Sequence, residues 1–417
     1  MTAWLAPTAD APVRATVTLP GSKSVTNRAL VLAALAERPT TVRRALRARD
    51  TTLMAAGLRA LGVGVEDSGP DWHVAPAPLH GGAVDCGLSG TVMRFLLAAA
   101  PLADGVVRFD GDAAARVRPL GDLAGALRAL GADISGDRLP LTVAANGALP
   151  GGDVTLDASA SSQFVSALLL AGCRYDKGVT VDHVGPPLPS APYVEMTLRM
   201  LADAGIAAER IGAHSWRVEP GRPHGGDVVV EPDLVNAIPF LAAALLTGGE
   251  VCAADWPERP LQAGDGMLAV LEALGGGTEA TPAGRVVRGG DGVHGADLDL
   301  HDVSELVPTV AVLACFAEGA TRVRGVGHIR GHETDRLAAL ATTLNDLGGR
   351  VTETADGLSI EPAPLHGGVF PTYGDHRLAT AGALVGLRVP GVELDDVTVT
   401  TKTLPDFPVL WLGMLGL

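Results

Sequence analysis

The sequence Leu-Arg-Ala-Leu-Gly-Ala-Asp-Ile at residues 127–134 recurs in altered form along the chain and decides the fold. Related segments occupy residues 58–65, 201–208, 271–278 and 344–351. Each places a glycine at the same point, and these glycines are Gly62, Gly131, Gly205, Gly275 and Gly348. They lie about 70 residues apart, and glycine is favoured just after the last turn of a helix. The pattern predicts a repeated structural unit that fits almost six times into 417 residues.

Each repeat has the same predicted order of strand, helix, strand, helix and two further strands (βαβαββ). Alternating apolar residues indicate the strands, and longer apolar runs or amphipathic patterns indicate the helices. The clearest strands are expected at 14–19, 106–109, 132–135, 139–143, 153–157, 179–181, 297–301 and 321–324. The clearest helices are expected at 164–171, 239–246, 306–316 and 407–415. Because the chain begins with one lone strand and ends on a helix, one repeat is expected to be completed by joining the two ends.

Six repeats could form a solenoid, but solenoid repeats are usually shorter, about 20–45 residues. Two globular domains of three repeats each agree better with the usual size of a hydrophobic core. We therefore predict one domain at 21–228 and a second at 1–20 plus 229–417, joined by two crossover hinges. The N-terminal strand then belongs with the C-terminal half.

The composition excludes several classes of protein. The net charge of −15 argues against a nucleic-acid binder, which needs a dense basic face. Residues 1–13 lack the features of a signal peptide, and no apolar run reaches the ~18 residues of a membrane span. The cysteines are far apart and are expected to be buried thiols in a cytoplasmic protein; they are Cys86, Cys173, Cys252 and Cys315.

Polar residues gather in the loop between the first strand and the first helix of each repeat. These loops contain residues 21–28, 89–94, 159–163, 233–236, 304–305 and 373–377. Serine, threonine and aspartate are ordinary helix caps, and that explanation covers about half of them. It does not explain the cations Lys23, Arg28, Arg94 and Arg377, because a helix N-terminus already attracts anions.

Further cations precede the second helices, namely Arg118, Arg330, Arg336 and Lys402. Any one of them could be a surface charge. Taken together in an acidic protein, they indicate a substrate or substrates with more than one carboxylate or phosphate group.

With these motifs the chain resembles the enolpyruvyl transferases. The resemblance is carried by Gly21-Ser-Lys-Ser-Val-Thr-Asn-Arg28, Ser89-Gly-Thr-Val-Met-Arg94, Ser161-Ser-Gln163, Glu333-Thr-Asp-Arg336, Asp375-His-Arg377 and Lys402. It implies an α/β fold of two inverse α/β barrel domains with a cleft that closes on its ligands. It also implies transfer of the enolpyruvyl group of phosphoenolpyruvate to the 5-hydroxyl of shikimate 3-phosphate, with release of phosphate. No cofactor or metal, nucleic acid or membrane partner is implied, and a monomer is expected.

The resemblance assigns roles residue by residue. The residues expected to hold phosphoenolpyruvate are Lys23, Gly90, Arg118, Gln163, Arg336, Arg377 and Lys402. Those expected to hold shikimate 3-phosphate are Lys23, Ser24, Arg28, Ser161, Ser162, Gln163, Ser190, Glu305 and His332, with Tyr193 beside them. Lys23, Glu305 and Glu333 are the expected catalytic residues: Glu305 is the base for the attacking hydroxyl, and Glu333 protonates the methylene carbon and must hold a proton near neutral pH.

Some positions depart from the family pattern. Glu305 stands where Asp is frequent, and His328 and His332 stand where some members have Asn and Lys. The nearest rival is the sister reaction on UDP-N-acetylglucosamine, whose enzymes typically carry Lys-Asn at positions 23–24 and often a cysteine in the loop that here spans 112–119. A non-catalytic repeat scaffold or an RNA-end-processing relative would lack the complete set of cations and carboxylates.

Overall fold

The computed structural model describes residues 2–417 and divides the chain into two compact units. One unit is Gly21–Val230, and the other combines Met1–Pro20 with Glu231–Leu417. The chain therefore passes between the units twice, at residues 20–21 and at 230–231. The expected boundary at residue 228 falls inside strand β14 (Gly226–Val229), which pairs with β3 (Thr40–Arg43) and so belongs to the first unit.

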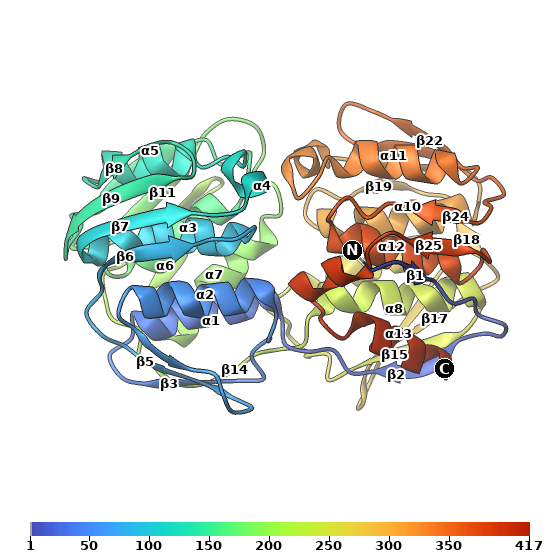
Figure 1. Ribbon diagram of the computed structural model, residues 1–417, viewed down its shortest axis with the longest axis horizontal. Helices are drawn as coiled ribbons and strands as arrows, with labels where there is room; N and C mark the ends of the chain where they lie inside the picture. Colours follow the sequence, from blue (N-terminus) through green and yellow to red (C-terminus); the bar gives the residue numbers. More distant parts are fainter. Residues whose placement is uncertain (1) are drawn as a thin grey trace. The chain divides into compact units, whose positions relative to one another are not determined.

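The unit Gly21–Val230 contains three four-stranded sheets of the same design (Figure 1). In each sheet the first two strands are parallel and the last two are added antiparallel. In sheet order the strands are β14, β3, β5 (Trp72–Ala75) and β4 (Gly64–Glu66); β6 (His80–Asp85), β7 (Asp104–Asp110), β9 (Leu141–Asn146) and β8 (Asp133–Ser135); and β10 (Gly152–Leu156), β11 (Val179–His183), β13 (Ser215–Val218) and β12 (Ala208–Gly212). The helices are α1 (Lys23–Ala34), α2 (Arg49–Ala60), α3 (Gly90–Ala99), η1 (Ala100–Leu102), α4 (Ala113–Arg116), α5 (Gly121–Ala129), α6 (Gln163–Gly172) and α7 (Pro192–Asp203).

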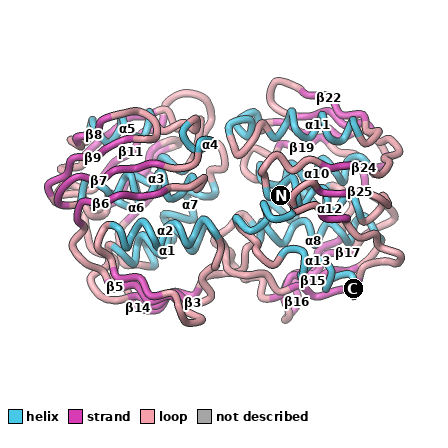
Figure 2. The backbone as a smooth tube through the Cα atoms, in the orientation of Figure 1, coloured by secondary structure: helices cyan, strands magenta, loops and turns pink. Residues whose placement is uncertain are grey.

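The other unit repeats this design, with one shortened sheet (Figure 2). In sheet order its strands are β2 (Arg14–Val17), β15 (Glu250–Ala254), β17 (Gly284–Arg288) and β16 (Gly277–Thr281); β19 (Asp297–Asp299), β21 (Thr321–Arg324), β23 (Leu358–Glu361) and β22 (Arg350–Glu353); β24 (Gly368–Phe370), β25 (Val392–Leu394) and β1 (Trp4–Leu5); and the pair β18 (Val293–His294) and β20 (Ala317–Glu318). Its helices are α8 (Leu234–Thr247), α9 (Gly264–Ala273), η2 (Ser304–Leu306), α10 (Val307–Cys315), η3 (Gly327–Gly331), α11 (Arg336–Asp346), α12 (His376–Gly386), η4 (Val397–Lys402) and α13 (Phe407–Leu415).

The structure confirms the expected α/β fold and shows how the N-terminal strand is used. Strand β2 lies parallel to β15, so the lone first strand completes a sheet of the C-terminal half, as expected. The two chain ends also meet, but through β1, which pairs antiparallel with β25, and not through β2. One repeat is thus completed by joining the two chain ends, as expected, although the N-terminal strand that completes it is β1.

The marker glycines end helices as predicted. Gly62, Gly131, Gly205, Gly275 and Gly348 have φ of 96°, 106°, 81°, 97° and 97°. Each directly follows the C-cap residue of α2, α5, α7, α9 or α11. A side chain is disfavoured in this left-handed conformation, so glycine recurs at the period of the fold.

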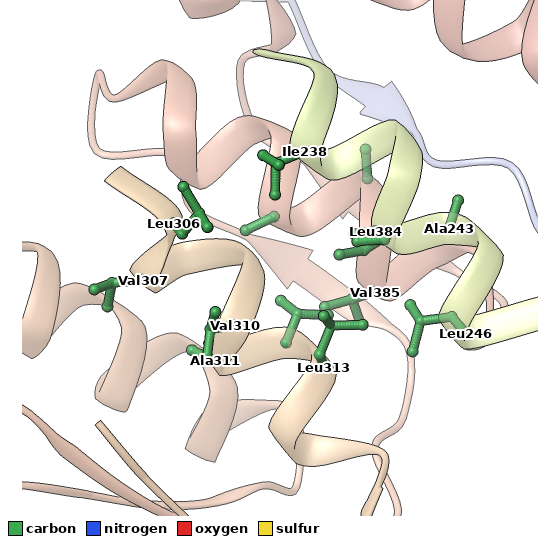
Figure 3. Close-up of a cluster of buried hydrophobic side chains, with 14 of the residues drawn as sticks. Ile238, Ala243, Leu246, Leu306, Val307, Val310, Ala311, Leu313, Leu384 and Val385 are labelled. Atoms are coloured by element: carbon green, nitrogen blue, oxygen red, sulfur yellow. The ribbon is translucent and has the colours of Figure 1, made fainter. Parts of the chain in front are cut away.

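The first helices of the repeats form the cores. In the unit that contains the C-terminus, α8, α10 and α12 contact one another through side chains such as Ile238, Val310, Leu313 and Leu384 (Figure 3). Nearly every residue of these three helices is buried, and most are apolar, as is typical of helices in the core of a large protein. Burial of each such side chain contributes about 1.5–3 kcal/mol. This rigid interior fixes the helix N-termini, where the polar loops begin.

The four cysteines are buried free thiols, as expected. Burial raises the pKa of Cys86, Cys173 and Cys315 to about 12, which removes them from thiolate chemistry near neutral pH. Among residues 2–417, no helix combines the length and the apolar character that crossing a bilayer requires.

Candidate active site

Three predicted residues, Gly90, Gln163 and Arg118, lie together in the unit Gly21–Val230, with Arg94 beside them. Gly90 is the first residue of α3, and a Cβ atom built on it would lie 3.1 Å from Gln163 Oε1 and Arg94 Nη1. The same Cβ would lie 3.4 Å from Arg118 Nη1. Arg118 lies in the loop before α5, and Gln163 begins α6. The fold thus brings Gly90, Gln163 and Arg118 together from three separate elements.

Arg94 sets the orientation of Gln163. Arg94 Nη1 donates to Gln163 Oε1 at 2.7 Å, and its guanidinium lies over the Phe164 ring. Because arginine only donates, Oε1 must be the amide atom that faces it, and the amide NH₂ is left as a donor toward other groups. Arg94 was noted in the sequence only as a cation. Its contact with Gln163, 69 positions away, could not be read from the sequence.

Lys23 faces a buried carboxylate. It begins α1, and its Nζ lies 3.4 Å from Asp50 Oδ2 in the first turn of α2. The Asp50 side chain is only 2 % exposed, whereas that of Lys23 is 22 % exposed. Asp50 was not predicted as a site residue, although its charge fixes the position of the Lys23 ammonium group.

The predicted serines lie on neighbouring loops. Ser161 and Ser162 precede α6, and the Ser161 hydroxyl accepts from the backbone N–H of Gln163 at 3.3 Å. Ser190 precedes α7 and is buried, and its φ of 51° is left-handed. A non-glycine residue in this conformation carries backbone strain, which is typical of functional loops. Ser24 and Tyr193 are half-buried at the starts of α1 and α7.

Arg28 is fully buried and joins three helices of this unit. It donates to Thr197 Oγ1 at 2.7 Å, to Ser166 Oγ at 3.1 Å and to the carbonyl oxygen of Tyr193 at 3.0 Å. Its guanidinium also lies over the rings of Phe95 and Tyr193. Burial lowers the pKa of Arg28 to about 10, so it remains charged at neutral pH. These contacts give Arg28 a packing role in addition to its predicted one.

In the other unit, Glu333 lies between two predicted cations. Its carboxylate accepts from Arg336 Nη2 at 3.0 Å and from Lys402 Nζ. The side chains of Glu333 and Lys402 are each 8 % exposed, and that of Arg336 is 3 % exposed. Two adjacent cations favour the ionised carboxylate, so a proton donor at this position must acquire its proton when ligands bind.

Asp375 holds Arg336 in place. Its carboxylate accepts from Arg336 Nε at 2.7 Å and Nη2 at 3.2 Å, and it also caps α12 by accepting from the backbone N–H of Arg377. Asp375 is fully buried. Burial lowers the pKa of Arg336, but Asp375, Glu333 and Glu305 outweigh that effect and raise it, so the guanidinium stays charged. The sequence singled out the motif that contains Asp375 but did not predict Asp375 itself as a site residue.

Arg377 extends this cluster of cations. Its Nη1 donates to Asn236 Oδ1 at 2.8 Å, and Asn236 Nδ2 donates to the carbonyl oxygen of Thr403, next to Lys402. His376, which precedes Arg377, is buried, and burial, reinforced by Arg377, Lys402 and Arg336, lowers its pKa well below the usual range. His376 is therefore neutral, and the charge of this cluster comes from Arg336, Arg377 and Lys402.

Three histidines form a row near Glu305. The rings of His301 and His328 pack edge to face at 5.8 Å, and those of His328 and His332 at 6.0 Å. His328 Nε2 contacts the hydroxyl of buried Ser304 at 2.9 Å, and Ser304 precedes Glu305 in η2. His332 Nδ1 accepts from Arg336 Nη1 at 3.0 Å. Glu305 lies close enough to raise the pKa of Arg336, so both predicted carboxylates of this unit act on one arginine.

The state of His328 leads to a pH prediction. Burial, with His301 and Arg336, lowers the pKa of His328 from 6.5 to about 4. The unfolded chain therefore takes up this proton at a higher pH than the folded chain, and stability falls as the pH drops from 6.5 toward 4. We expect His328→Asn to remove part of this loss, up to about 3 kcal/mol. Thermal unfolding of both proteins between pH 7 and 4.5 measures it, and parallel curves would contradict the prediction.

The predicted residues are divided between the two units. Lys23, Ser24, Arg28, Gly90, Arg118, Ser161, Ser162, Gln163 and Ser190 belong to one unit, and Glu305, His332, Glu333, Arg336, Arg377 and Lys402 belong to the other. Arg330 is separate from this cluster, since it forms ion pairs with Asp335 and Glu353 and donates to the carbonyl oxygen of Thr354.

The chain is similar to known proteins in sequence and in fold. The family model described as EPSP synthase (3-phosphoshikimate 1-carboxyvinyltransferase) matches residues 7–411. A 3-phosphoshikimate 1-carboxyvinyltransferase from Kocuria rhizophila is 52 % identical over 99 % of the chain and 96 % of its own length. The structure of EPSP synthase from Acinetobacter baumannii is similar with a TM-score of 0.81 and 25 % identity, over 98 % of the chain and 97 % of its own. The enolpyruvyl transferase NikO from Streptomyces tendae shares the fold, with a TM-score of 0.77 and 19 % identity over 99 % and 97 % of the two chains.

Proposed function

The chain belongs to the EPSP synthase family, and from that premise we propose that it catalyses the reaction for which the family is named. The enolpyruvyl group of phosphoenolpyruvate is transferred to the 5-hydroxyl of shikimate 3-phosphate, and inorganic phosphate is released. This places the chain in aromatic amino-acid biosynthesis. The observation that carries the proposal is the buried cluster of Glu333, Arg336, Lys402 and Asp375, which combines an acid with fixed cations.

We propose that phosphoenolpyruvate is held by the cations of both units. Arg118, Lys23 and the amide of Gln163 supply donors from one unit, and Arg336, Arg377 and Lys402 supply them from the other. Gly90 leaves space at the centre of its group, since a Cβ there would meet Gln163, Arg94 and Arg118. Arginine pairs bidentately with carboxylate and phosphate, so this set suits a ligand that carries both.

Shikimate 3-phosphate is assigned mainly to the serine loops. Ser161, Ser162 and Ser190 donate from their hydroxyl groups to its phosphate. Arg28 donates to the ring carboxylate from a guanidinium N–H that is not used in its contacts within the protein. Ser24 contacts the ring, with Tyr193 beside it. Glu305 and His332 are assigned to the ring hydroxyls.

The reaction proceeds by addition and then elimination. Glu333 protonates C3 of phosphoenolpyruvate, which gives C2 cationic character, and Glu305 accepts the proton of the 5-hydroxyl as its oxygen bonds to C2. In the second step C3 returns a proton to the Glu333 carboxylate and the C2–O bond to phosphate breaks, which releases inorganic phosphate. Positioning of the two anions can account for ~7–11 kcal/mol of the barrier, and fixed charges such as Lys23 stabilise the charge that develops.

The acceptor decides between this function and the sister reaction. Release of phosphate from phosphoenolpyruvate is measured with shikimate 3-phosphate and, separately, with UDP-N-acetylglucosamine. We expect release with the first acceptor alone. Release with the UDP sugar alone would transfer the assignment to that reaction, and no release with either would favour a non-catalytic scaffold.

Substitution of Arg118 tests the phosphoenolpyruvate site. Arg118 is 8 % exposed and converges on Gly90, so we expect Arg118→Ala to raise the KM for phosphoenolpyruvate at least tenfold, the loss of about one charged hydrogen bond. Arg116→Ala is the matched control, because Arg116 lies two residues away but pairs with Asp110 at the surface. An unchanged KM in Arg118→Ala would remove Arg118 from the site.

Binding of both substrates should also change the shape of the protein. Since each substrate is assigned donors from both units, we propose that binding closes the units about the two crossover hinges. We expect the radius of gyration in solution scattering to fall when shikimate 3-phosphate is added, and the forward scattering to give the mass of a monomer. A radius of gyration that does not change would contradict closure.

A further inference from the structure

His183 joins the two loops that carry the predicted phosphate-binding serines. It is the last residue of β11, and its parallel partner in the sheet is Leu156, the last residue of β10. The chain continues from β10 into the loop with Ser161 and Ser162, and from β11 into the loop with Ser190. His183 therefore lies where both loops begin, and it is only 6 % exposed.

Both ring nitrogens of His183 are engaged by backbone groups of these loops. Nδ1 accepts from the backbone N–H of Ala158 at 3.1 Å, and Nε2 lies 2.8 Å from the carbonyl oxygen of Pro186. A backbone N–H can only donate and a carbonyl oxygen can only accept. The ring is therefore the neutral tautomer with its proton on Nε2, and it bridges the two loops through one acceptor and one donor.

Each bridged residue leads directly to a serine. The carbonyl oxygen of Ala158 accepts from the N–H of Ser161 at 3.0 Å, which closes the turn that presents Ser161. Pro186 starts the segment that leads to Ser190, whose carbonyl oxygen accepts from the N–H of Tyr193 at the start of α7. The loops also touch each other, since a Cβ on Gly185 would lie 2.9 Å from the Asp157 carboxylate. The left-handed backbone of Ser190 needs such support from its surroundings.

We propose that His183 is a positioning residue for the phosphate group of shikimate 3-phosphate. It does not contact the substrate. It sets the distance between the Ser161–Ser162 loop and the Ser190 loop, so that the hydroxyls of both loops reach one phosphate group. The inference rests on the proposed function, because that function assigns the phosphate to these serines.

Two substitutions of His183 separate its contacts. His183→Phe keeps a ring of similar size but removes both hydrogen bonds and leaves the Ala158 N–H unpaired. His183→Asn places an oxygen close to the Nδ1 position and so restores the bond to Ala158 alone. His214→Phe is the matched control. The His214 ring packs edge to face on the His183 ring at 5.9 Å, but His214 forms its hydrogen bond to His183 through its backbone carbonyl oxygen, which accepts from the His183 backbone N–H.

We expect His183→Phe to raise the KM for shikimate 3-phosphate about tenfold or more, with the KM for phosphoenolpyruvate changed less than twofold, and His183→Asn to recover part of the loss. Calorimetry should show weaker binding of shikimate 3-phosphate and unchanged binding of shikimate, which has no phosphate. Equal losses for both ligands, or an unchanged KM in a folded His183→Phe, would overturn the inference. If His183→Phe does not fold, the same comparison of the two ligands is made with His183→Asn.

Ser161→Ala and Ser190→Ala separate this inference from the proposed function. If they raise the KM for shikimate 3-phosphate and the His183 variants do not, the serines bind the phosphate without help from His183. If the serine variants also leave the KM unchanged, the assignment of the phosphate to these loops fails, and the role of His183 fails with it.

Discussion

Glu333→Gln should fold normally and lose between about 10²- and 10⁴-fold of kcat, the usual contribution of a general acid. The substitution preserves the shape of the side chain and removes its ability to deliver a proton. Glu333 is the carboxylate of the cluster that contacts both Lys402 and Arg336, and its side chain is 8 % exposed. Single-turnover measurements with both substrates would report the loss directly, since product release does not mask the chemical step.

The position of Glu333 also explains when it would be protonated. Lys402 and Arg336 both contact its carboxylate, and two adjacent cations favour the ionised form. In the proposed complex, phosphoenolpyruvate would offer these two cations a phosphate and a carboxylate, which would draw them away from Glu333 and add negative charge beside it. The proton is therefore taken up with the ligand, and a binding measurement in buffers of different ionisation enthalpy should show that uptake in the wild type and its loss in Glu333→Gln.

Glu353→Gln provides the control for this prediction. Glu353 also forms an ion pair with an arginine of the same unit, Arg330, at 2.6 Å, but its side chain is 38 % exposed. We expect its kcat to stay within twofold of the wild type. A kcat near the wild-type value in Glu333→Gln would show that another group protonates the methylene carbon.

The repeats could be predicted because the fold requires the same local conformation at five corresponding positions. Each second helix must end in a left-handed residue, so a glycine recurs there, and the predicted elements match the observed ones closely, as with 321–324 and 407–415. The choice of partner strand could not be predicted in the same way. Strands β14 and β2 each pair with a strand far away in the sequence, and such pairings depend on tertiary packing rather than on the local pattern.

The candidate site, like the fold, could be predicted from the sequence only in part. The cations could be identified because charges at apolar helix starts are unusual, and the family motifs contain them. The groups that hold the site residues in place were missed, namely Asp50 beside Lys23, Asp375 beside Arg336, and the contact of Arg94 with Gln163. In a sequence, an aspartate before a helix is first interpreted as a cap, and Asp375 is indeed the N-cap of α12. Arg336 lies 39 residues earlier in the sequence, and only the structure shows that it donates to the carboxylate of Asp375.

Asp375→Asn should be the most destabilising single substitution in the candidate site. Asp375 is the fully buried partner of Arg336, whose side chain is itself only 3 % exposed. Neutralising one partner of a buried ion pair leaves an uncompensated charge and typically costs about 3–5 kcal/mol. For a unit of this size we expect the thermal midpoint to fall by roughly 6–12 °C at the lower end of that cost. The KM for phosphoenolpyruvate should also rise, because Arg336 loses the group that orients it.

Asp335→Asn is the matched control for Asp375→Asn, because Asp335 also caps a helix and pairs with an arginine but is much more exposed. Asp335 caps α11 by accepting from the N–H of Ala338, as Asp375 caps α12, and it also pairs with an arginine, Arg330. Its side chain is 40 % exposed, so water can replace the lost charge, and we expect a cost below about 1 kcal/mol with an unchanged KM. Equal destabilisation by the two substitutions would mean that Asp375 acts as a helix cap alone, and that its ion pair with Arg336 contributes neither stability nor alignment.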